Sequence, residues 1–130
     1  MSDDFDWIKA RLACSPQMIF KELEYGVGRD VDTIKAQRPE RAEEFQVLPA
    51  ADGKMQFSII RHHPKGRSET VEFSLVGEKI AVKNPLTGAV SFTASLTLNN
   101  DGECRLKVNN EELEQWQVRR KALEDLLFSE

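Results

Sequence analysis

The chain has 130 residues, of which 40% are hydrophobic and 31% are charged, and its formal net charge is −4. This balance is typical of one globular domain that folds without a metal or disulfide, and the acidic charge argues against a general nucleic-acid binder, whose affinity depends on neutralising phosphates. The longest apolar runs are much shorter than the ~20 residues that span a bilayer. The acidic start lacks the features of a secretory signal. We therefore expect a cytoplasmic protein that does not interact with membranes.

The first third of the chain predicts two helices. Apolar residues recur at helical spacing in residues 3–14, and the serine–proline pair that follows is typical of the start of a helix over 16–37. Gly26 and Gly28 interrupt this second helix, each costing about 1 kcal/mol relative to alanine. Because the apolar spacing continues in phase, we favour one helix, kinked or frayed at the glycines. The alternative is a break, with Asp30 capping a separate helix.

Beyond residue 43 the apolar spacing changes from helical to alternating, which is typical of strands. Six strands are expected, at about 44–49, 54–61, 69–76, 78–84, 89–98 and 103–108. The short connections favour an antiparallel meander with one face covered and the other partly wet. The apolar face of the fifth strand is expected to hold Val90, Phe92, Ala94, Leu96 and Leu98. The opposite row of small hydroxyl side chains is a candidate surface for a ligand or a second subunit: Ser91, Thr93, Ser95 and Thr97.

A last helix is expected over residues 110–128, with Asn109 as its N-cap. A sheet face and a helix stripe that are both apolar usually bury each other. The sequence therefore predicts one α+β domain over residues 1–130. It has N-terminal helices, an antiparallel meander of five or six strands, and a C-terminal helix packed on the sheet.

The connection between the second and third expected strands carries three basic residues and two histidines without an acid among them: Arg61, His62, His63, Lys65 and Arg67. In an acidic protein this loop is a candidate anion-binding site. We favour the alternative, a solvated hairpin connection whose charges prevent pairing at the sheet edge. Adjacent histidines point to opposite sides of an extended chain, so no metal site is expected here.

Two aromatic surfaces are candidates for partner binding, because tryptophan and arginine are enriched in interface hot spots. One is Trp116 with Arg119 and Arg120 on the last helix, and the other is Trp7 on the first. In both places we favour the alternative that the tryptophan packs in the core, with the neighbouring charges solvated. Cys14 and Cys104 are interpreted as two separate reduced thiols.

No catalytic constellation is evident. The chain has neither a phosphate-binding glycine loop nor a nucleophile elbow, and no cofactor is expected. We therefore expect a small non-enzymatic protein that acts through protein–protein binding or self-association. The alternative is a domain that binds a small ligand or an anion, through the sheet face or the Arg61–Arg67 loop. A third hypothesis is an enzyme whose site is assembled from scattered residues such as His62 and His63.

Overall fold

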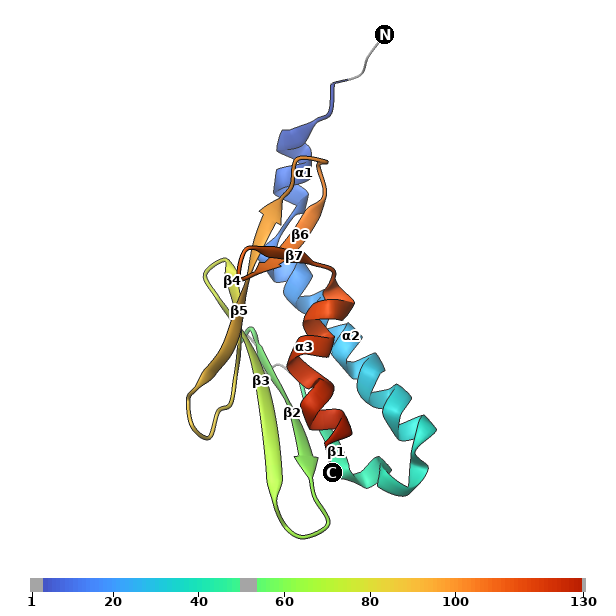
Figure 1. Cartoon of the computed structure of the whole chain (residues 1–130). Helices are drawn as coiled ribbons and strands as arrows, with labels where there is room; N and C mark the ends of the chain where they lie inside the picture. Colours follow the sequence, from blue (N-terminus) through green and yellow to red (C-terminus); the bar gives the residue numbers. More distant parts are fainter. Residues whose placement is uncertain (1–3, 50–53, 130) are drawn as a thin grey trace.

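Helices occupy the two ends of the chain and a sheet lies between them in sequence (Figure 1). The structure is a computed structural model and describes residues 4–49 and 54–129. The helical elements are α1 (Trp7–Ala13), α2 (Pro16–Gln37), the 3-10 helix η1 (Pro39–Glu44) and α3 (Gln115–Phe128). The strands are β1 (Phe45–Leu48), β2 (Gln56–His62), β3 (Ser68–Val76), β4 (Lys79–Lys83), β5 (Val90–Leu98), β6 (Cys104–Val108) and β7 (Glu111–Leu113).

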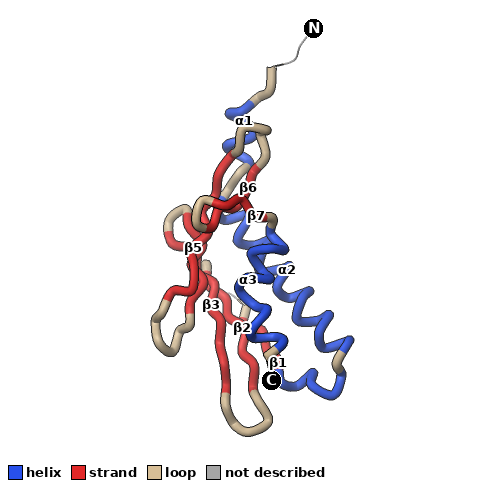
Figure 2. The backbone as a smooth tube through the Cα atoms, in the orientation of Figure 1, coloured by secondary structure: helices blue, strands red, loops and turns tan. Residues whose placement is uncertain are grey.

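The strands form one sheet in the order β1-β2-β3-β4-β5-β6-β7, and each pairs antiparallel with the next. α2 and α3 lie on the same side of this sheet (Figures 1 and 2). Between the two layers, the rings of Phe57 and Phe73 stack across β2 and β3 at 4.8 Å, and Phe20 of α2 lies 5.2 Å from Phe57. The predicted α+β meander is confirmed, with seven strands rather than five or six.

α2 is one continuous helix, so the predicted alternative of a break at the glycines is wrong. Ser15 Oγ caps it by accepting a hydrogen bond from the Met18 backbone N–H at 3.4 Å. The two glycines have different surroundings: a Cβ on Gly28 would meet nothing within 4 Å, whereas one on Gly26 would lie 2.7 Å from a guanidinium nitrogen of Arg119. Gly26 therefore lets the arginine of α3 approach the α2 backbone.

The start of the last helix differs from the prediction. Asn109 and Asn110 both have positive φ, 53° and 66°, which is the geometry of a two-residue hairpin turn. The chain turns back there and adds β7, with Glu111 opposite Val108, before α3 begins. Glu114 then forms a capping box with Gln117. The expected N-cap at Asn109 is wrong because both asparagines are used in the turn.

The apolar face predicted for the fifth strand is also corrected at one end. The register of β4 and β5 shifts between Val82 and Lys83, so that Val82 lies opposite Phe92 and Lys83 opposite Val90. This irregularity leaves Ser91 without a partner in the register and moves Val90 out of the row of Phe92 and Ala94. Val90 is accordingly 56% exposed, while Phe92 and Ala94 are buried.

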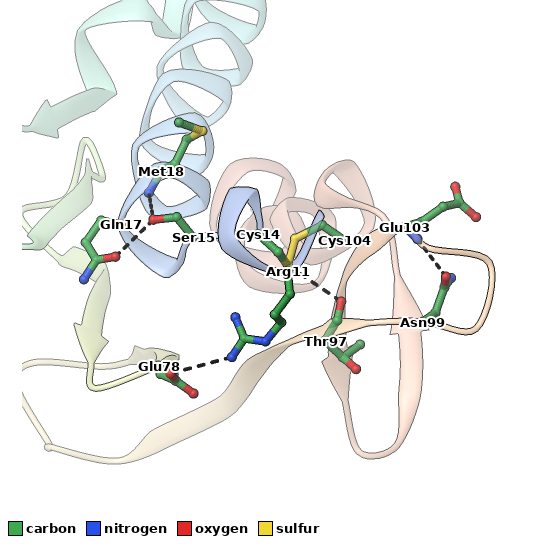
Figure 3. The surroundings of a disulfide bond; sticks show 10 residues. All are labelled: Arg11, Cys14, Ser15, Gln17, Met18, Glu78, Thr97, Asn99, Glu103 and Cys104. Atoms are coloured by element: carbon green, nitrogen blue, oxygen red, sulfur yellow. Dashed lines mark hydrogen bonds and ion pairs between the residues drawn. A yellow bond between two sulfur atoms is a disulfide. The ribbon is translucent and has the colours of Figure 1, made fainter. Parts of the chain in front are cut away.

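α1 is attached to the rest of the protein in an unusual way. It begins after Asp6, whose side chain accepts a hydrogen bond from the Lys9 backbone N–H at 3.0 Å; the predicted start at Asp3 lies outside the described residues. None of the α1 residues, all of which the structure describes, is buried. A disulfide between Cys14 and Cys104, 90 residues apart, joins its end to β6 (Figure 3). The prediction of two separate reduced thiols is therefore wrong, because the meander brings β6 beside the α1–α2 connection.

Candidate binding groove

A hollow of about 540 Å³ lies between the second half of α2 and the length of α3. Its floor consists of buried aliphatic side chains, Ile34 from α2 and Leu123 and Leu127 from α3. α2 and α3 lie side by side at this end of the protein (Figure 2). The same three side chains belong to the core cluster, so the floor of the hollow is the outer edge of the core. We call this hollow the α2–α3 groove.

Two exposed aromatic residues stand on the α3 side of the groove. Trp116 is 50% exposed and Phe128 is 58% exposed. Trp116 is held in place because its indole N–H donates to Glu114 Oε2 at 2.8 Å. The guanidinium carbon of Arg38, at the end of α2, lies 5.4 Å from the centre of the Phe128 ring. Both rings therefore have a polar neighbour while about half of each side chain or more stays exposed.

Charged pairs flank the apolar floor. Arg119 Nε donates to Asp30 Oδ2 at 2.7 Å and connects α3 to α2. Arg120 Nε donates to Glu124 Oε2 at 2.9 Å along α3. With Arg38, the lining has three cations and two anions. A net positive charge in a protein of net charge −4 distinguishes this groove from the average surface.

Three of the four residues predicted for partner binding meet in this groove: Trp116, Arg119 and Arg120. The favoured interpretation of Trp116 as a core residue is wrong, since half of its surface is exposed. Trp7 lies on α1, away from the groove, and at 62% exposure it too is not a core residue (Figure 1). Sequence reasoning missed Arg38 and Phe128, which come from different helices, and only the packing of α2 beside α3 brings them together.

The residues of the basic loop that were predicted as an anion site do not lie together: Arg61 is apart from the others. Arg61 lies on β2 and is buried, with 2% exposure. Its guanidinium donates to Glu44 at 3.2 Å, to the Leu126 carbonyl at 2.9 Å and to the carbonyl of Ser129. Arg61 therefore connects the end of α3 to β2 and η1, and it satisfies carbonyls that the helix itself leaves open.

The other residues of the loop have neighbours of their own. His62 lies within hydrogen-bond distance of Ser68 Oγ, at 3.2 Å, and Gln46 Oε1, at 3.1 Å. The carboxylate of Glu69 lies 3.0 Å from Arg67 and 3.5 Å from Nε2 of His63. Glu69 thus adds a negative charge to a loop whose cations also include Lys65. This arrangement fits a solvated hairpin connection better than a strong anion site.

The uncharged hydroxyl row lies on the sheet face opposite the helices. Thr93 and Ser95 are paired in register with Ala81 and Lys79 of β4, and the row ranges from exposed to partly exposed. On the same face, the buried carboxylate of Glu72 accepts a hydrogen bond from Ser74 at 3.1 Å and lies 3.5 Å from the Lys83 ammonium. The Glu72 carboxylate therefore has its partners within the sheet.

In the part of the chain that the structure describes, no cluster of three or more His, Cys, Asp or Glu side chains could hold a metal ion. Among the helices within residues 4–49 and 54–129, none is long and apolar enough to cross a bilayer. Comparison with protein families, with characterised proteins and with solved structures finds no match to this chain. The α2–α3 groove is therefore the candidate functional site.

Proposed function

We propose that this is a non-enzymatic binding protein that holds an apolar segment of a protein partner in the α2–α3 groove. The observation that carries the proposal is the combination of an apolar floor with two exposed aromatic rings, Trp116 and Phe128. Interface hot spots have this composition: aromatic and arginine side chains around a pocket that a partner can fill. Exposing both rings to water has no evident benefit for the fold, and a bound segment would remove that exposure.

The shape and charge of the groove indicate what kind of segment would fit. The groove follows α3 from Trp116 to Phe128, which corresponds to about 18 Å of helix. A hollow of this length between two helices suits an amphipathic helix with apolar residues at i, i+3 or i+4, and i+7. Arg119 and Arg120 are paired with Asp30 and Glu124, so the remaining charge at the rim is that of Arg38, which favours an acidic residue near the Phe128 end of the bound segment. We therefore expect a partner helix that is apolar on one face and acidic at one end.

Selection from a library of helical peptides tests the proposal. The bait is the full chain, and the counter-bait is the Trp116→Ala, Phe128→Ala double variant, which keeps the groove floor intact. Enriched peptides should show the apolar helical spacing with an acid at one end, and should bind the counter-bait at least about tenfold more weakly. A Leu86→Ala variant, which removes an exposed side chain elsewhere, is the matched control. Failure to enrich any peptide that distinguishes bait from counter-bait would rule the proposal out.

A small apolar anion is the second candidate occupant of the same groove. Its volume of about 540 Å³ lies within the range of about 300–1,000 Å³ for small-molecule sites. An apolar ring system with one negative charge would use the floor and the arginine rim together. Titration with 8-anilinonaphthalene-1-sulfonate, followed by fluorescence, tests this candidate. Saturable binding that the double variant loses would support it, and fluorescence unchanged by the folded protein would eliminate it.

The disulfide bears on where the protein works. Disulfides persist in oxidising compartments and are rare in the reducing cytosol. The Cys14–Cys104 bond therefore favours an oxidising compartment over the cytoplasmic location predicted from the sequence. Rapid alkylation of thiols in intact cells, followed by mass spectrometry, measures the state directly. Two alkylated cysteines in the native protein would contradict this assignment and support a cytoplasmic location.

A further inference from the structure

The exposed apolar side chains of α1 form a second candidate binding surface. Trp7, Ile8 and Leu12 are 62%, 56% and 77% exposed. Ile8 and Leu12 are four residues apart and share one side of the helix, and Trp7 adjoins them. Phe5, just before the helix, is different: its ring lies against Gly102, where a Cβ would stand, so it already contacts the β5–β6 turn. The apolar side of α1 itself is open to solvent.

From the exposed helix and the open groove of the same chain, we infer that α1 of one copy of the protein occupies the α2–α3 groove of a second copy. The inference rests on the proposed function of the groove and names its occupant. α1 is a helix of about 10 Å, which fits within a groove of about 18 Å. Its three exposed apolar side chains would cover the aliphatic floor beside Trp116 and Phe128.

The occupant has to come from another copy. α1 ends where α2 begins, at one end of the protein, and the disulfide fixes Cys14 to β6 there (Figures 1 and 3). The groove begins on α2 at Asp30, which is about 20 Å further along the helix from Pro16. Figure 1 shows α1 and the C-terminal end of α3 at opposite ends of the molecule. The helix therefore cannot fold back into its own groove without unfolding part of α2.

The order of charges agrees with a two-fold arrangement. Asp4 and Asp6 precede the apolar side chains of α1, and Lys9 and Arg11 lie within and behind them. The groove has Arg38 at its Phe128 end, whereas Asp30 and Glu124 further back are already paired with Arg119 and Arg120. If the partner's α2 runs antiparallel, the acidic start of α1 meets Arg38.

A two-fold axis would form this contact twice. An isologous dimer uses the same pair of surfaces in both directions and closes, which avoids an open chain of subunits. Two contacts also double the buried area toward the ~1,200 Å² that specific interfaces need. Assembly would cover Trp7 of one copy and Trp116 and Phe128 of the other.

Complementation between two variants tests the inference. The α1 variant is Ile8→Glu, Leu12→Glu and retains the groove; the groove variant is Trp116→Ala, Phe128→Ala and retains α1. Sedimentation equilibrium of the wild-type chain, at concentrations up to about 100 μM, should show a dimer. Each variant alone should dissociate at least about tenfold more readily. Their equimolar mixture should form a heterodimer, because one of the two contacts is intact in it. The control variant Leu86→Glu, Val76→Glu, at two other exposed apolar positions, should dimerise like wild type.

Three outcomes would overturn the inference: a wild-type chain that remains monomeric, a dimer that tolerates the α1 variant, or two dissociated variants whose mixture fails to associate. The last outcome would assign the dimer to a different pair of surfaces. Failure here is distinguishable from failure of the proposed function. A monomeric chain whose groove still selects helical peptides would refute only the second copy as occupant, whereas a groove that selects none would refute both.

Discussion

The two ends of α2 are stabilised in different ways. At its N-terminal end, a covalent bond between Cys14 and Cys104 holds α1, a helix without a buried residue, against the fold. At its C-terminal end, α3 is held by packing, by the Arg119–Asp30 pair and by the buried guanidinium of Arg61. A helix that buries an apolar face contributes its own stability, while a short helix that buries nothing depends on the attachment. Exposed aromatic residues occur at both ends: Trp7 on α1 and Phe128 at the end of α3.

Of the changes considered, removing the disulfide should cause the largest loss of unfolding free energy. In the chain-entropy model, a bond that closes a loop of 90 residues contributes roughly 4–5 kcal/mol of unfolding free energy. The Cys14→Ser, Cys104→Ser double variant should lose that amount in urea denaturation, and reduced wild type should match it. Hydrogen exchange should show α1 losing protection while α3 keeps it. An unchanged denaturation midpoint would show that the disulfide does not support the N-terminal end.

Arg61→Ala should be nearly as damaging at the other end. It removes a buried charge and leaves the Glu44 carboxylate and the Leu126 carbonyl without their donor, a change that typically costs about 3–5 kcal/mol. The control is Arg67→Ala in the same loop, whose exposed pair with Glu69 is worth about 0–1 kcal/mol. Chemical denaturation of both variants measures the difference. Similar losses for the two arginines would contradict the structural role assigned to Arg61.

The two glycines of α2 provide a smaller and sharper test. Gly28→Ala should stabilise the protein by about 0.5–1 kcal/mol, since the new methyl group meets nothing and alanine favours helix. The Gly26→Ala variant should have an unfolding free energy about 1 kcal/mol lower than that of Gly28→Ala, because the new Cβ at position 26 displaces Arg119 from Asp30. In a double-mutant cycle, Asp30→Asn should then cost less in the Gly26→Ala background than in wild type. If both alanine variants were stabilised equally, the close approach of Arg119 of α3 would not explain why position 26 is a glycine.

The smallest stability effects should come from the groove aromatics. Trp116→Ala and Phe128→Ala should each change the unfolding free energy by less than about 1 kcal/mol, since both rings are half exposed or more. Leu123→Ala, in the floor of the same groove and 2% exposed, should cost about 2–5 kcal/mol. Thermal denaturation compares the three variants. Large losses at the aromatic positions would show that they serve the fold rather than binding.

The sequence by itself determined the order and kind of the secondary structure. Alternation of apolar residues predicted six of the seven strands within a few residues, because a strand with one covered face has to repeat every second position. The missed strand, β7, has only three residues, and its turn at Asn109 and Asn110 was interpreted as a helix cap. Both features need the same polar residues, so local sequence does not separate them.

Tertiary structure alone decided which residues meet. It buried Arg61 beneath the end of α3, although its neighbour His62 remains at the surface, because one step along a strand reverses the face. It joined Cys14 to Cys104 and Arg38 to Phe128 across most of the chain. It also placed Trp116 on a rim rather than in the core. Each outcome depends on which elements of the chain pack against each other. The spacing of residues within one element carries no information about the element that packs against it.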